Sequence, residues 1–217
     1  MPNWCDNTLT VSGKEEDVNA FVEKAKGYGW QPENQGNEEK LMSLDCNQFV
    51  PMPKEVIENG YNGKGNLEGV MSGYDWETIT WGTKWGACNC DVSYMSDTNV
   101  YYSFQTAWRP CDKVIYAMIK QYPKLEFHLD YAEYGMMFKG SISGFDGELK
   151  AETCEAISLE EVCEMGWHDG SEQENSEGCD ACHDYCLKNG LTSDREPPIE
   201  EQIRIEIKED WNNEKTI

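Results

Sequence analysis

The sequence predicts an α+β fold, in which an antiparallel sheet carries its helices on one face. Three observations predict it: strands in which apolar and polar residues alternate, two amphipathic helices, and a polar turn between two consecutive strands. Residues 125–132 give the clearest strand, because every second side chain is apolar. These side chains are Leu125, Phe127, Leu129 and Tyr131.

The N-terminal part predicts a strand, a helix and a second strand. The first strand is expected at residues 8–11, and Ser12 with Glu15 has the spacing of a helix capping box. The helix that follows has an apolar face with i, i+3, i+4, i+7 spacing. This face consists of Val18, Phe21, Val22 and Ala25. A second strand is expected at residues 41–50, and a short helix after Pro53.

The middle of the chain predicts a hairpin, a helix and another hairpin. Residues 87–95 and 100–106 read as strands, and the polar residues 96–99 supply the turn between them. A helix is expected after Pro110, with an apolar stripe that includes Ile115, Met118 and Ile119. Residues 136–142 are expected to pair with the strand at 125–132. This order of elements is typical of a ferredoxin-like antiparallel sheet with helices packed on one face.

Charge and hydropathy exclude several classes of protein. The 217 residues include 41 acidic and 18 basic side chains, for a net charge of −23. Because there is no basic patch for a phosphate backbone, we expect no direct nucleic acid binding. No apolar run approaches the roughly 20 residues that span a bilayer, and no signal peptide is recognisable at the N-terminus. We therefore expect a folded, cytoplasmic protein without a membrane segment.

The acidic charge is unevenly distributed. Residues 1–150 hold 13 basic and 22 acidic side chains, whereas residues 151–217 hold 5 and 19. The sequence therefore predicts two parts: a ferredoxin-like α+β domain at 1–150, and an acidic, Cys-rich C-terminal extension at 151–217 with short helices and a late strand. The chain has ten cysteines, and without an export signal most are expected to be free thiols.

Four sequence motifs resemble a known family. They are MPNWCDNTL at residues 1–9, WGTKW at 81–85, FQTAWRP at 104–110, and YAEYG with FKG at 131–135 and 138–140. Over residues 1–150 the chain resembles the YubB-type ferredoxin-like domain family, whose members are carried by phages and conjugative plasmids. The resemblance implies a ferredoxin-like fold without an iron–sulfur cluster and an origin on a mobile element. It implies no reaction.

Aromatic and basic residues make up one candidate binding site. Its members are Trp81, Lys84, Trp85, Trp108 and Arg109. The tryptophans suit a half-buried seam between sheet and helices, and this structural role is the main expectation. The alternative is a pocket in which the two cations hold an anionic ligand or a nucleotide against the indoles.

One cysteine and histidine cluster has the spacing of metal ligands. Its members are Cys179, Cys182, His183 and Cys186, and they would share one face of a helix. A structural zinc site needs four such ligands, so zinc is a possible cofactor. Two alternatives remain open: the cysteines pack as small apolar side chains or stay free thiols, or they form a disulfide.

No motif of a known catalytic site occurs, so we expect a protein that is not an enzyme. The net charge instead suggests a phage or plasmid accessory protein that binds a host protein through an acidic surface. A host protein with a basic nucleic-acid-binding surface is the expected partner, and an anti-defence inhibitor that imitates nucleic acid is the most specific form. The carboxylates expected to bind include Glu172, Glu174 and Glu177. Alternatives are a small-ligand or nucleotide-binding domain, or a zinc-stabilised structural protein.

Overall fold

The computed structural model describes residues 3–29 and 41–158. The described strands are β1 (Trp4–Ser12), β2 (Cys88–Ser96), β3 (Asn99–Ala107), β4 (Glu126–Glu133), β5 (Phe138–Phe145) and β6 (Glu148–Ala156). The described helices are α1 (Glu15–Ala25), α2 (Lys54–Asn59), α3 (Gly73–Thr80), α4 (Asp112–Gln121) and a single 3-10 turn, η2 (Cys46–Gln48). The chain divides into two compact units, Met1–Cys154 and Glu155–Ile217, and nearly all described residues belong to the first.

The six strands form one sheet in the order β2-β3-β1-β4-β5-β6. β1 pairs with both β3 and β4, and these pairings, like β2 with β3 and β4 with β5, are antiparallel. Helix α1 connects β1 to β2, and α4 connects β3 to β4, so the first four strands have the βαββαβ connectivity of a ferredoxin-like fold. The β5–β6 hairpin extends the sheet beyond β4, and η2, α2 and α3 lie between α1 and β2 in the chain.

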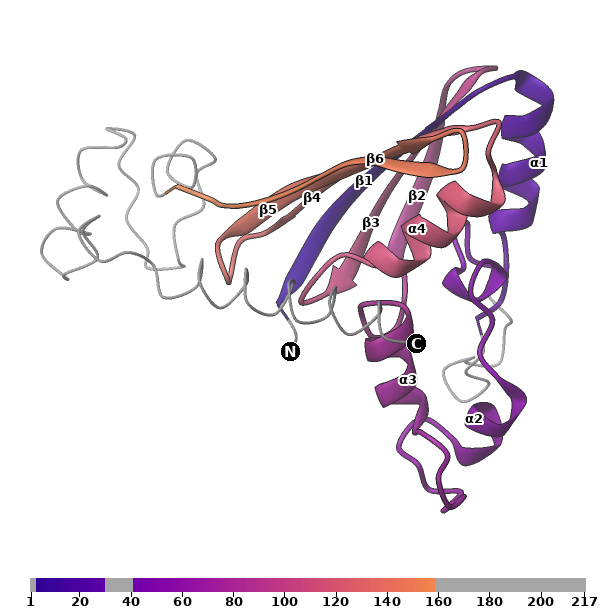
Figure 1. Ribbon diagram of the computed structural model, residues 1–217, viewed down its shortest axis with the longest axis vertical. Helices are drawn as coiled ribbons and strands as arrows, with labels where there is room; N and C mark the ends of the chain where they lie inside the picture. The colour runs from indigo at the N-terminus through magenta and orange to yellow at the C-terminus, as the bar shows by residue number, and fades with distance from the viewer. Residues whose placement is uncertain (1–2, 30–40, 159–217) are drawn as a thin grey trace, which may run out of the picture. The chain divides into compact units, whose positions relative to one another are not determined.

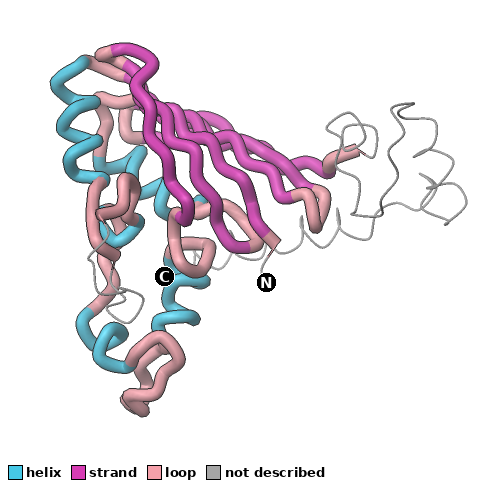
Figure 2. The backbone as a smooth tube through the Cα atoms, turned by 180° about the vertical axis from the view of Figure 1, so that it is seen from behind, coloured by secondary structure: helices cyan, strands magenta, loops and turns pink. Residues whose placement is uncertain are grey.

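Helices α1 and α4 cover one face of this sheet (Figure 1). Alternation along β1 explains the packing, because Cys5, Asn7, Leu9 and Val11 are buried while the side chains between them are half-buried or exposed. Phe21 of α1 lies at the centre of the core. Its ring contacts four aromatic rings, those of Phe49, Tyr102, Tyr122 and Phe127. Seen from behind, the opposite face carries no described helix (Figure 2).

These observations confirm the predicted fold class, an antiparallel sheet with helices packed on one face. The apolar faces predicted for the two helices are buried at Val18, Phe21, Val22 and Ala25 in α1 and at Ile115, Met118 and Ile119 in α4. The acidic C-terminal extension lies almost entirely outside the described residues, so the predicted division after residue 150 stays a prediction. In the described residues, no helix is long and apolar enough to cross a membrane.

Two local predictions were wrong. Residues 41–50 do not form a strand. They contain η2, and Met42 forms one isolated bridge with Gly27. The chain turns here because the carboxylate of Asp45 accepts a hydrogen bond from the amide of Asn47. Helix α1 begins at Glu15 without a side-chain cap, so Ser12 does not form the predicted capping box. Ser12 is the last residue of β1, and its hydroxyl donates a hydrogen bond to the side-chain oxygen of Asn99 at 2.6 Å. Strand β6 was not predicted from the sequence.

Candidate functional site

Three tryptophans and a lysine meet where β1 begins and β3 ends. The ammonium of Lys84 lies 3.9 Å from the ring centroid of Trp85 and 4.0 Å from that of Trp108. The ring of Trp85 also lies 6.1 Å from that of Trp4. We call these four residues the tryptophan–lysine cluster. Both distances from the ammonium are well inside the range of about 6 Å over which a cation is attracted to an aromatic face.

Strand pairing and buried hydrogen bonds hold the cluster together. Trp4 pairs with Ala107 across β1 and β3, and the amide of Trp108 donates to the carbonyl of Asn3 at 2.8 Å. The hydroxyl of Thr83 donates to the carbonyl of Ala107, also at 2.8 Å, so the loop before β2 is fixed to the end of β3. These contacts bring together residues that are far apart in the sequence.

Two of the tryptophans have an unusual backbone conformation. Trp85 has a φ of 68° and Trp108 a φ of 70°, in the left-handed region that bulky side chains rarely adopt. The amide of Trp85 is held by the buried carboxylate of Glu77, which accepts it at 2.9 Å. Because such conformations cost on the order of 1–3 kcal/mol and often occur at functional sites, the cluster is a candidate binding site.

The other two predicted members of this site lie apart from the cluster. Trp81 is only 2% exposed, packs against Trp76 and donates its indole N–H to the carbonyl of Val50 at 2.9 Å. Its role is therefore structural. Arg109 forms an ion pair with Asp112 at 3.5 Å. Of the five predicted residues, the structure brings Lys84, Trp85 and Trp108 into contact.

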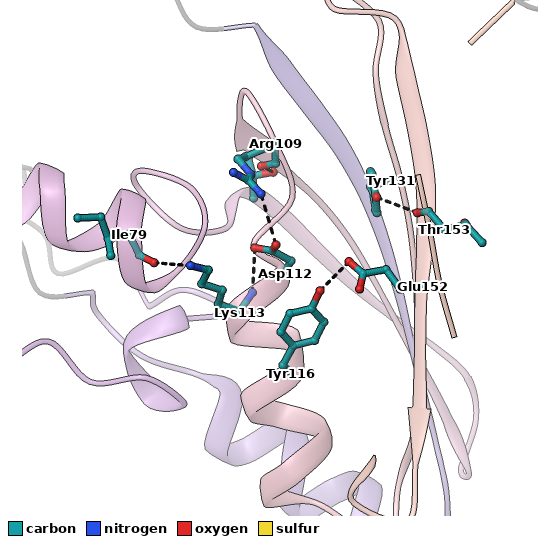
Figure 3. Close-up of polar contacts among 9 residues, drawn as sticks. Ile79, Arg109, Asp112, Lys113, Tyr116, Tyr131, Glu152 and Thr153 are labelled. Carbon is teal, nitrogen blue, oxygen red and sulfur yellow. Dashed lines mark hydrogen bonds and ion pairs between the residues drawn. The ribbon is translucent and has the colours of Figure 1, made fainter. Parts of the chain in front are cut away.

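A second polar cluster lies where α4 begins (Figure 3). The hydroxyl of Tyr116 donates to the carboxylate of Glu152 on β6 at 2.6 Å, which joins helix and edge strand. Burial raises the pKa of Asp112, and the neighbouring guanidinium of Arg109 partly opposes this effect. Burial also raises the pKa of Tyr116, and its hydrogen bond to Glu152 raises it further. This cluster was not predicted from the sequence, because the contact between Tyr116 and Glu152 depends on the unpredicted strand β6.

The open face of the sheet carries exposed carboxylates. They are Asp6 on β1, Asp91 on β2, and Glu126 and Asp130 on β4. The register places all four on the side away from the helices, together with Trp4, Tyr101 and several hydroxyl and amide side chains. The side-chain amide of Gln105 donates a hydrogen bond to the carboxylate of Asp6 at 2.9 Å. The Nε2 atom of His128 lies 3.1 Å from a carboxylate oxygen of Asp130. At the open-face positions of β1 to β5, Lys139 is the only lysine or arginine.

The predicted metal ligands and the predicted acidic binding residues lie outside the described part of the chain. This applies to Cys179, Cys182, His183 and Cys186, and to Glu172, Glu174 and Glu177. Within residues 3–29 and 41–158, no three histidine, cysteine, aspartate or glutamate side chains group as a metal site would need. A zinc site in the extension stays a prediction, and measuring zinc content by native mass spectrometry would test it.

Comparison with known proteins agrees with the strand order. Residues 76–178 match the family described as the ferredoxin-like domain in Api92-like protein. The crystal structure of the protein api92 from Yersinia pseudotuberculosis superposes with a TM-score of 0.57 at 10% sequence identity, over 73% of this chain and 99% of that one. A search of curated proteins gave no match. The chain therefore has a ferredoxin-like fold, and residues 76–178 are similar to the domain found in Api92-like proteins.

Proposed function

We propose that this is a non-enzymatic binding protein that attaches to a basic surface of a partner protein through exposed carboxylates. The observation that carries the proposal is the open sheet face with Asp6, Asp91, Glu126 and Asp130, on a chain of net charge −23. An acidic surface attracts a basic partner and repels nucleic acid.

A host protein with a nucleic-acid-binding channel is the partner that fits this chemistry best. Carboxylates that follow the spacing of phosphates could occupy such a channel and keep nucleic acid out. The resemblance of residues 1–150 to the YubB-type family predicts an origin on a phage or plasmid, and a protein of such an element gains from inhibiting host defence. An anti-defence inhibitor is therefore the most specific form of the proposal.

The nucleotide-binding alternative has less support from the geometry. Arg109 is paired with Asp112, the ammonium of Lys84 faces two indole rings, and Trp81 is buried in the core. A thermal-shift series with mono-, di- and cyclic nucleotides tests this alternative directly. Stabilisation by any of them would favour it over the acidic-face proposal.

The proposed function is tested by a pull-down from bacterial lysate at low and high salt, with the recovered proteins identified by mass spectrometry. We expect basic nucleic-acid-binding proteins at low salt, their loss at high salt, and their displacement by added DNA. The variant Asp6→Asn, Asp91→Asn, Glu126→Gln, Asp130→Asn should bind these proteins measurably more weakly than the unmodified protein. A matched control neutralises four carboxylates on helices α1 and α2.

The control variant is Glu15→Gln, Glu16→Gln, Glu55→Gln, Glu58→Gln, which changes the net charge by the same amount. Because these four exposed side chains lie away from the open face, the control should retain its partners. Equal losses in both variants would mean that net charge, and not the sheet face, determines binding. A partner set without basic proteins would contradict the proposal itself.

A further inference from the structure

We propose that Trp85 and Trp108 form a cation-binding site, which Lys84 occupies in the isolated protein and which an arginine side chain of a partner enters in its place. The cation site follows from the geometry of the tryptophan–lysine cluster. The assignment of the arginine to a basic partner protein rests on the proposed function. The inference thus names one contact by which the partner is recognised.

The first argument is that one ammonium contacts two aromatic rings supplied by different segments. Trp85 lies in the loop before β2, and Trp108 follows β3, yet the centroids of both rings lie within 4.0 Å of the same Lys84 nitrogen. Proteins bind organic cations with aromatic groups arranged in this way. Lys84 is thus positioned as a ligand would be.

The second argument is the backbone conformation of both tryptophans. Each has a positive φ, and the hydrogen bonds from Trp108 to Asn3 and from Trp85 to Glu77 hold the two residues in place. A protein that needed only apolar packing here could use residues with ordinary backbone angles. Rings fixed in advance lose little conformational entropy when they bind a cation, which favours a binding role.

The third argument concerns the exchange of lysine for arginine. Trp108 is 37% exposed, so the cluster is open to solvent on at least one side. An ammonium is strongly hydrated and sits on a flexible chain, whereas a guanidinium is planar, more weakly hydrated and stacks on aromatic faces. Arginine is therefore the better occupant, and Lys84 can move into water at low cost.

The fourth argument is the charge next to the cluster. Trp4, whose ring contacts Trp85, occupies the open-face position of β1 next to Asp6, so the cluster lies at one end of the acidic face. A partner that places an arginine on the indoles would present its neighbouring basic side chains to the carboxylates of that face. Aromatic anchors beside complementary charges are common at the centres of protein interfaces.

The test is an NMR titration of the full chain, with the indole Nε1–H resonances as the readout. The probe is N-acetyl-arginine amide, and the isosteric, uncharged control is N-acetyl-citrulline amide. Lys84→Ala should bind the arginine probe about 3- to 30-fold more tightly than the unmodified protein, which corresponds to removing a competing cation–π contact. Lys84→Arg keeps the site occupied and should show no such gain. Lys54→Ala, which removes the same charge from α2, should also leave affinity unchanged.

Two further measurements cover the case in which a variant fails to fold. Trp108→Asn removes the ring and supplies a residue that tolerates a positive φ, so binding of the probe should be lost while Trp108→Phe retains part of it. In the unmodified protein, the arginine probe should move the Lys84 ε-methylene resonances toward their values in a free lysine. This experiment needs no variant.

Three results would overturn the inference. They are equal affinity of Lys84→Ala and the unmodified protein, equal binding of the citrulline probe, and indole shifts without any change at Lys84. The pull-down with open-face variants fails or succeeds independently of this titration. Failure of the cation site is therefore distinguishable from failure of the proposed function.

Discussion

Cysteines in the described part of the chain differ in their exposure to water and therefore in their expected reactivity. Cys154 on β6 is exposed, whereas Cys5, Cys46 and Cys111 are buried. Burial raises the pKa of Cys88 to about 11 and that of Cys90 to about 12, so few thiolates form there at neutral pH. Among these six cysteines, iodoacetamide at pH 8 should modify Cys154 first, as measured by peptide mapping over time.

The order of modification also reports on the fold. Cys88 and Cys90 should react slowly, and the three buried thiols should react only when denaturant is added. Cys154→Ser is the control that identifies the fast site. Fast modification of Cys46 or Cys111 in the native protein would contradict the packing of η2 against the start of α4.

Asp112 makes stability depend on pH in a direction opposite to that of a well-paired carboxylate. Its side chain is 15% exposed, and burial raises its pKa above the ordinary value of 3.8 despite Arg109. The folded state therefore binds this proton more tightly than the unfolded state. The contribution of Asp112 to stability is present below pH 3.8 and falls as pH rises through the raised pKa.

Asp112→Asn removes this titration. The free energy of unfolding of the native protein, minus that of the variant, should fall as pH rises across that window, measured by urea denaturation at several pH values. The same change at Asp146, in an exposed turn where asparagine tolerates the φ of 56°, is the control. A difference that rises with pH would show that the pairing with Arg109 outweighs burial.

At the level of elements, the contact between β5 and α4 depends on a missing side chain. A Cβ at Gly144 would lie 2.6 Å and 2.7 Å from two carbons of Ile119, and 2.9 Å from the carbonyl of Glu148. Gly144→Ala should therefore push the helix from the sheet and destabilise the protein by about 1–3 kcal/mol. Thermal and urea denaturation would measure the loss.

A double-mutant cycle separates this clash from a general effect of alanine in a strand. Ile119→Ala alone leaves a cavity and should cost about 2–5 kcal/mol. If the two side chains compete for the same space, the double variant should be clearly more stable than the sum of the single losses indicates. Additive losses would mean that the helix does not lie against Gly144 as described.

The elements that were predicted correctly are those with a clear pattern in their local sequence. Strand β4 and the helices α1 and α4 bury one regular face each, so periodicity identifies them. Strand β6 has every residue exposed and therefore no alternation to detect. Helix α3 had a local signal that was overlooked, since the hydroxyl of Ser72 accepts the amide of Asp75 as an N-cap.

The candidate site could be predicted only in part, for a related reason. The sequence indicated tryptophans beside cations, and Lys84 with Trp85 is a local pair. The contact with Trp108 depends on the pairing of β1 with β3 and on two positive φ angles, neither of which a local pattern reveals. Trp81 looks equivalent to Trp85 in the sequence, but its side chain lies in the core.

For the whole molecule, the central question is where the functional acidity lies. Residues 151–217 hold 5 basic and 19 acidic side chains, and the described sheet adds a separate set of carboxylates on its open face. Each set can therefore be neutralised alone and its share of the binding measured.

The extension should carry the larger share, because it holds more than half of the excess negative charge. Glu172→Gln, Glu174→Gln, Glu177→Gln should weaken binding of the pull-down partner at low salt and flatten its salt dependence, measured by biolayer interferometry with poly-L-lysine as a defined basic probe. The free energy of unfolding of the domain should change by less than about 0.5 kcal/mol, since surface substitutions rarely change stability by more than this. Full binding by this triple variant, together with loss in the open-face variant, would instead assign recognition to the sheet.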